Sequence, residues 1–139
     1  MPRYDAVEVG TELPVREFPI TRATLVRYAG ASGDRNPIHW KERIAKAVGL
    51  PDVIAHWMLT MATAGRIVTD WAEDPGAVES YGVRFKAPVV VPDDDQGATV
   101  VVSGTVEEKL EDGRVVVGLT ARVGDGDVLS AARAVVRLA

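Results

Sequence analysis

The sequence predicts an α+β fold in which antiparallel strands follow a mostly helical first part. Apolar residues recur at helical spacing between residues 21 and 74, whereas they alternate with polar residues between 77 and 139. Two turn sequences typical of hairpins, Asp112-Gly113 and Gly124-Asp125-Gly126, separate the alternating runs. A sheet that is half-buried by a long apolar helix is an α+β arrangement.

The first predicted helix is short. Thr21 is a suitable N-cap for a helix over Arg22–Ala29, and Gly30 is expected to end it. The following stretch, Ser32–Pro37, contains the residues that favour turns and is predicted to be a loop.

Two further helices are predicted before the strands. Residues Trp40–Val48 form the first, and Gly49 ends it. The second is longer, Met58–Trp71, and is apolar on nearly all sides, which indicates a buried helix. Gly65 lies inside it and costs about 1 kcal/mol of helix propensity relative to alanine. The close approach of another backbone or of a ligand would explain this glycine.

The second half reads as a meander of strands. A strand is predicted near Ser80–Ala87, and three runs with period two follow it: Val100–Val106, Val115–Val123 and Val128–Leu138. The last run is rich in small residues, which would allow the long helix to lie close to it. The pattern predicts a helix-covered antiparallel sheet.

Composition excludes several classes of function. The 139 residues fit a single domain, 1–139, with 16 basic and 20 acidic residues and no basic cluster, so neither nucleic acid nor a membrane surface is expected as a partner. The absence of cysteine excludes disulfides, thiolate catalysis and cysteine-ligated metals. No stretch resembles a signal peptide or a membrane span, so a cytoplasmic location is expected.

One segment carries candidate chemistry. Asp34 and His39 lie five residues apart across a proline-containing loop, which can hold an acid–base pair at a fixed separation. Asn36 adds an amide beside them. Structural roles are also open: Asp34 can bond local backbone N–H groups, and His39 can be a buried histidine that bonds a carbonyl. Spacing alone favours these structural roles.

The chain has only one other histidine, His56, directly before the long helix. The first N–H groups of a helix lack intrahelical partners and can stabilise negative charge on a carbonyl oxygen. The His56 side chain itself is expected only to cap or to pack. Two histidines seventeen residues apart with scattered carboxylates match no metal-ligand spacing, so no metal site is predicted.

The segments 28–39 and 54–58 together resemble a known signature. The order Tyr-Ala-x-x-Ser-Gly-Asp-x-Asn-Pro-Ile-His followed by Ile-Ala-His-x-Met is similar to that of the MaoC-like (R)-specific enoyl-thioester hydratases and dehydratases, and residues 81–89 extend the similarity. Within the family, the chain most resembles the B, catalytic, subunit of actinobacterial (3R)-hydroxyacyl-ACP dehydratase.

This resemblance implies a hot-dog fold, a curved antiparallel sheet wrapped around a long central helix. It implies reversible dehydration of (R)-3-hydroxyacyl thioesters, carried by CoA or ACP, without a cofactor. His39 would take a proton from one water and Asp34 would deliver one to Cα, while the backbone N–H of residue 57 holds the enolate oxygen. A homodimer, or a heterodimer with a related hot-dog subunit, is expected.

The chain departs from the family pattern at two candidate substrate-binding positions. Trp57 replaces a glycine, and Gly65 replaces a serine of many stand-alone hydratases. The indole of Trp57 can shorten the acyl channel, can block the site and leave a binding or scaffolding subunit, or can be an introduced substitution. It would also be strained if the family glycine has a positive φ. A thioesterase is disfavoured because Met58–Val68 contains no acidic residue.

Overall fold

A six-stranded antiparallel sheet forms the body of the protein, and the computed structural model describes all residues 1–139. The strand order is β1-β3-β4-β6-β2, with the short β5 paired to β4. All pairings are antiparallel, so the predicted α+β arrangement is confirmed. The strands are β1 (Glu12–Ile20), β2 (Val78–Phe85), β3 (Ala98–Lys109), β4 (Arg114–Val123), β5 (Gly126–Asp127) and β6 (Leu129–Arg137).

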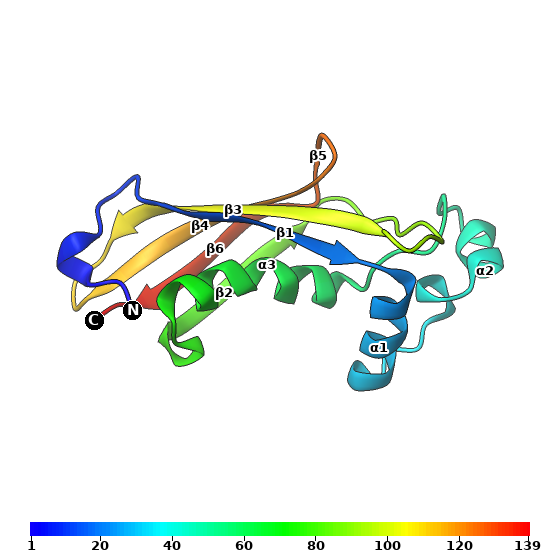
Figure 1. Cartoon of the computed structure of the whole chain (residues 1–139), viewed down its shortest axis with the longest axis horizontal. Helices are drawn as coiled ribbons and strands as arrows, with labels where there is room; N and C mark the ends of the chain where they lie inside the picture. The colour runs from blue at the N-terminus through cyan, green and yellow to red at the C-terminus, as the bar shows by residue number, and fades with distance from the viewer.

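The helices occupy two places around this sheet (Figure 1). The long helix α3 lies along one face of the sheet, while α1 and α2 lie at the end opposite the chain termini. None of the helices is both long and apolar enough to span a membrane. The α-helices are α1 (Arg22–Ser32), α2 (Glu42–Ala47) and α3 (Trp57–Ala72), and the 3-10 turns are η1 (Tyr4–Ala6), η2 (Pro37–His39) and η3 (Pro75–Ala77).

Helix α1 begins where the sequence predicts and ends later. Thr21 and Thr24 form a reciprocal capping box at its start. The prediction that Gly30 ends the helix is wrong: α1 continues to Ser32, and Gly33 ends it with a φ of 77°. The left-handed conformation costs glycine little, and it allows the Gly33 N–H to bond the carbonyl of Ala29. The chain therefore leaves the helix directly before Asp34.

Helix α2 is shorter than the predicted Trp40–Val48. It begins at Glu42 because Trp40 belongs to the preceding turn, where its N–H bonds the carbonyl of Pro37. At the other end Gly49 has a φ of 93°, in agreement with its predicted role as the residue that stops the helix.

Helix α3 matches the predicted Met58–Trp71 to within one residue at each end. The prediction of a buried helix is correct for one side only, because the sheet covers only one of its faces. The side toward the sheet carries the buried residues, among them Ala64, Ile67 and Val68. The opposite side is open, and Met58 is 57% exposed there. This open side is apolar in its first turns, at Met58 and Ala62, and charged further along, at Arg66 and Asp70.

Valines of the central strands β3, β4 and β6 form the middle of the core beneath α3. The period-two rows predicted from sequence provide them, and Val100, Val102, Val115 and Val117 are fully buried. Gly104 on β3 lies under the side chain of Ile67 from α3, since a Cβ there would be 3.1 Å from Cδ1 of Ile67. Close packing of α3 on the sheet thus fixes the line of the helix.

This close approach makes Gly104 a sensitive position. We expect Gly104→Val to lower the free energy of unfolding by about 1–3 kcal/mol, because the added atoms overpack the core against Ile67 and Leu119. Urea denaturation monitored by circular dichroism measures the change. Gly82→Val is the matched control on exposed strand β2, where nothing lies within 4 Å of the added Cβ. Equal effects of the two substitutions would contradict the argument that the core has no room for a side chain at Gly104.

Candidate active site

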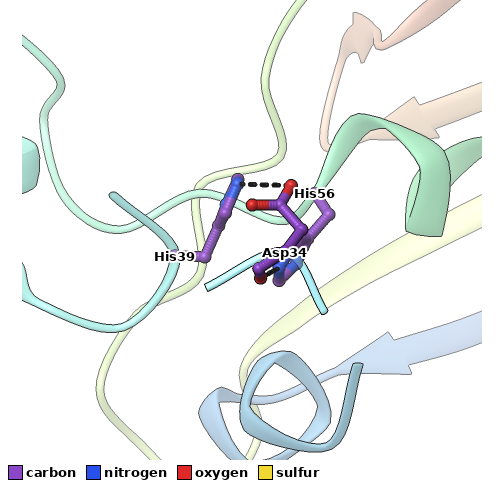
Figure 2. A group of neighbouring side chains, drawn as sticks. All are labelled: Asp34, His39 and His56. Atoms are coloured by element: carbon purple, nitrogen blue, oxygen red, sulfur yellow. Dashed lines mark hydrogen bonds and ion pairs between the residues drawn. The ribbon is translucent and has the colours of Figure 1, made fainter. Parts of the chain in front are cut away.

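Asp34 lies in the loop between α1 and η2, with its carboxylate held by the loop itself. Its Oδ1 accepts a hydrogen bond from the backbone N–H of Asn36 at 3.2 Å, and its own N–H donates to Oγ of Ser32 at 3.1 Å. Its Oδ2 faces His39 (Figure 2). The local hydrogen bonding expected of a loop aspartate is present, and it leaves one carboxylate oxygen free.

His39 ends the turn η2 and is 4% exposed. Its Nδ1 lies 2.7 Å from the carbonyl oxygen of Ile54. A carbonyl only accepts, so Nδ1 carries the proton in the neutral ring and Nε2 carries a lone pair. Desolvation by burial lowers the pKa of His39, while its hydrogen bond to Ile54 acts in the opposite direction. The ring is therefore set up as a neutral base.

The free atoms of these two residues lie close together without bonding. Nε2 of His39 is 3.8 Å from Oδ2 of Asp34, which is longer than a hydrogen bond. Both atoms accept hydrogen bonds when the imidazole is neutral and the carboxyl is ionised. A water molecule can donate one hydrogen to each of them, so the pair can hold and activate one water.

Helix α3 begins beside this pair with free backbone donors. Trp57 is its first residue, and His56, the N-cap, provides no side-chain cap. The first N–H groups of the helix, that of Trp57 included, have no acceptor within the helix, and the helix dipole adds positive potential at this end. This end of α3 can therefore bind a carbonyl oxygen as negative charge develops on it.

The Trp57 backbone is unstrained. Its φ is not among the positive values in the chain, so the strain expected for a tryptophan at a glycine position does not arise. The indole packs against Phe85 at the end of β2, with ring centroids 5.2 Å apart. It stacks on neither histidine ring.

Asn36 shapes the loop that holds the pair. Its side-chain oxygen accepts the N–H of Ile38 at 3.2 Å, and it is the N-cap of η2. Pro37 follows at the first position of the turn, where a missing N–H costs nothing. The sequence Asn-Pro thus turns the chain so that His39 comes back toward Asp34.

Gly65 lies away from the pair, about 12 Å along the axis of α3 from Trp57. A neighbouring backbone does not explain this glycine, because the nearest neighbour is a side chain; the predicted role in binding a ligand stays a prediction. A Cβ at Gly65 would be 2.9 Å from the Tyr81 ring. The Tyr81 hydroxyl donates to the carbonyl of Met61 at 2.8 Å, and burial raises its pKa to about 12. Gly65 and Tyr81 line a largely apolar cavity of about 250 Å³.

His56 joins the site, which spacing did not predict. Its ring stacks on that of His39 with centroids 3.7 Å apart and planes 20° apart, and its Nε2 is 3.0 Å from the carbonyl oxygen of Asp34. The expected cap is absent, and the expected packing is correct. The one sequence signal was that both histidines of the chain lie in the two motif segments.

Ligand atoms of Asp34, His39 and His56 lie within 4.8 Å of one another. Spacing along the chain gave no indication of this cluster. The geometry does not favour a metal ion, because the two imidazole rings are stacked with their planes 20° apart, which places their in-plane lone pairs in two separate, nearly parallel planes. A tetrahedral ion needs lone pairs that converge on one point. The cluster has the arrangement of an acid–base site.

Comparison with known proteins identifies the family. Residues 6–123 match the family described as MaoC like domain. The chain belongs to this family. It is 34% identical over 129 residues to 3-hydroxybutyryl-CoA dehydratase of Methylorubrum extorquens, covering 91% of this chain and 78% of the relative. The family predicted from the motif is thus confirmed.

Other relatives are longer. The chain is 44% identical over 79 residues to 3-hydroxyacyl-thioester dehydratase X of Mycobacterium tuberculosis, covering 57% of this chain and 27% of the relative. A solved MaoC-like dehydratase superposes with a TM-score of 0.96 and 42% identity over 99% of this chain and 42% of that chain. The chain thus spans less than half of these two proteins.

A further solved structure shows the fold in a complex. The ChsH1–ChsH2 complex of Mycobacterium tuberculosis matches with a TM-score of 0.81 and 27% identity, covering 95% of this chain and 98% of that chain. These superpositions confirm the predicted hot-dog fold.

The lowered pKa of His39 gives a direct test of the site. We expect this imidazole to titrate below 6.5, so that it is neutral at pH 7 and becomes charged only as the pH falls through the lowered pKa. NMR titration of the two histidines measures it, and His39→Gln assigns the signals. The chain unfolded in urea is the reference, in which His39 is expected near its ordinary value of 6.5. A folded value for His39 at or above 6.5 would contradict the desolvation argument.

Proposed function

We propose that this chain catalyses the reversible hydration of trans-2-enoyl thioesters to (R)-3-hydroxyacyl thioesters. The observation that carries the proposal is the 3.8 Å approach of Nε2 of His39 to Oδ2 of Asp34, beside the uncapped start of α3. Family membership supports the same chemistry, since one relative is named as a dehydratase of a 3-hydroxyacyl thioester, 3-hydroxybutyryl-CoA. Asp34 and His39 are the proposed catalytic residues.

Substrate binding begins with the thioester carbonyl. In our proposal its oxygen accepts the backbone N–H of Trp57, where the positive end of the helix dipole stabilises the enolate that forms. The carbonyl itself makes the Cα proton acidic, so no cofactor is required. We also propose that Asn36 contacts the substrate through its amide nitrogen, because its side-chain oxygen already accepts the N–H of Ile38.

One proton then moves through the pair. During hydration His39 Nε2 takes a proton from water as the oxygen attacks C3, and negative charge moves to the thioester oxygen. The proton passes from His39 to Asp34, and Asp34 delivers it to Cα. Dehydration reverses each step: Asp34 takes the Cα proton, and His39 returns it to the departing hydroxyl. Both residues end as they began, with His39 neutral.

For the acyl group we propose a short channel. The indole of Trp57 leans on Phe85 rather than on the histidines, which favours narrowing of the acyl path over blockage of the site. Further along α3 the Tyr81 ring fills the space beside Gly65 and leaves the cavity of about 250 Å³. The alternative of an inactive scaffolding subunit loses support, because the indole packs against Phe85 and stacks on neither histidine ring.

As partner we propose a second hot-dog unit, a copy of this chain or a related subunit. Two surfaces support it: the exposed apolar side of α3, which includes Met58, and the free edge of strand β2. The solved MaoC-like dehydratase is more than twice as long as this chain, and the ChsH1–ChsH2 structure is that of a complex. The acyl carrier is proposed to be CoA or ACP, which present the same type of thioester.

Removal of either proposed catalytic group should abolish most activity. We expect Asp34→Asn and His39→Gln each to lower kcat for hydration of crotonyl-CoA by about 10²- to 10⁴-fold, since proton transfer is lost. Loss of enone absorbance measures the rate, with the chain alone and with any co-encoded relative. Asp125→Asn, in an exposed turn, is the charge-matched control and should retain wild-type activity. The proposal fails if wild type is inactive under both conditions, or if Asp34→Asn is as active as wild type.

Trp57 should set acyl length. We expect wild type to prefer short enoyl thioesters, and Trp57→Gly to gain activity on long ones because the channel lengthens while the backbone N–H remains. The ratio of kcat/KM for dodecenoyl-CoA to crotonyl-CoA measures this. Phe85→Ala, which removes the neighbouring ring but keeps the indole, should change the ratio less. An unchanged ratio in Trp57→Gly would exclude the indole as the limit.

A further inference from the structure

His56 is held between two rings at the centre of the site. It is 2% exposed and stacks on His39 on one side. Tyr28 of α1 meets it edge-on, with ring centroids 4.7 Å apart and planes at 62°. A group this deeply enclosed cannot contact a substrate directly, so any influence on the reaction must act through its neighbours.

The imidazole of His56 does something that an apolar ring cannot. Its Nε2–H donates to the backbone carbonyl of Asp34, at 3.0 Å, across 22 residues of sequence (Figure 2). Its other nitrogen, Nδ1, is buried without any hydrogen-bond partner. Burial of an unbonded polar atom is costly, so packing alone would favour phenylalanine at this position. The hydrogen bond to the carbonyl of Asp34 is the contact that an imidazole makes and a phenyl ring cannot.

These two contacts connect the halves of the proposed site. Asp34 and His39 supply the acid–base pair, while the next residue after His56, Trp57, supplies the proposed oxyanion donor. A shift of the loop relative to α3 would move the water away from C3 of a substrate held at the helix. His56 opposes such a shift because it bonds one member of the pair and stacks on the other.

We propose that His56 is a positioning residue that fixes the Asp34–His39 pair relative to the backbone N–H of Trp57. The proposal rests on the hydratase function above. The titratable groups that face His56 are Asp34 from the loop, His39 from η2 and Tyr28 from α1. Burial is the largest cause of the lowered pKa of His39, and His56 lowers it further, so the histidine also helps to keep its neighbour a free base.

The first variant, His56→Phe, keeps a ring against His39 and removes the donor to Asp34. We expect kcat for enoyl-thioester hydration to fall by about 10- to 100-fold, because a misplaced reacting group costs rate of this order. KM should be nearly unchanged, because His56 does not touch the substrate. Val117→Ala, which removes buried methyl groups from the sheet, is the control for stability and should keep kcat. Thermal denaturation of both variants accompanies the kinetics.

The second variant, His56→Gln, leaves His39 as the only imidazole in the chain. NMR titration should show the pKa of His39 raised relative to wild type, and the acid limb of the pH profile of kcat/KM should rise with it. A purely structural role would move neither the pKa of His39 nor the acid limb of the profile.

The proposal is overturned if His56→Phe retains kcat within about twofold, if KM rises in place of the fall in kcat, or if the pKa of His39 in His56→Gln is unchanged. Wild-type activity that is lost in Asp34→Asn but kept in His56→Phe would overturn the positioning role and leave the proposed function intact.

Discussion

The hydrogen bond between Nδ1 of His39 and the carbonyl of Ile54 is the interaction on which the site depends. A second hydrogen bond joins the same two segments, since the N–H of Ile54 donates to the carbonyl of Ile38 at 3.2 Å. The same segment is tied to the chain between β2 and β3, because the N–H of Ala55 donates to the carbonyl of Val89 and the carbonyl of Val53 accepts the N–H of Val91. One short extended segment therefore anchors the turn η2, which carries His39, and leads directly into α3.

Burial and tautomer are consequences of this anchoring. With Nδ1 engaged, the lone pair of His39 can only lie on Nε2, the atom that faces Asp34. With the ring enclosed, its charged form is disfavoured. Asp34 is treated differently: its carboxylate is more than half exposed, and one of its oxygens is held by the loop. The two partners thus differ in environment, which is how an acid–base pair acquires distinct roles.

Much of the fold can be predicted from the sequence, because periodicity reports which face of an element is buried. Helix α3 and the strands β3, β4 and β6 were predictable on this basis. Whether a second unit covers a face is not encoded in periodicity, so the open side of α3 was missed. The end of α1 was also missed, since Gly30 and Gly33 are equally good candidates until one of them has to turn left-handed.

The site was predictable to the extent that it is local. Asp34, Asn36 and His39 share one loop, and their spacing together with the family motif brings them together. His56 reaches Asp34 across 22 residues, and Tyr81 reaches Met61 across 20. Such contacts depend on how α3 packs against the loop and against β2, and no local sequence pattern specifies this packing. The position of the Trp57 indole depends on Phe85 for the same reason.

Gly33 ends α1 in a left-handed conformation directly before Asp34, so the position of Asp34 depends on the length of α1 rather than on its composition. Each residue added to a helix rotates the chain beyond it by about 100° and advances that chain by about 1.5 Å. An insertion or deletion in α1 would therefore swing Asp34 away from His39 while every side chain of the site was still present. The number of residues in α1, counted up to Gly33, therefore sets where Asp34 lies. We expect this number to be invariant even where outward-facing residues of the helix, such as Val26, are free to vary.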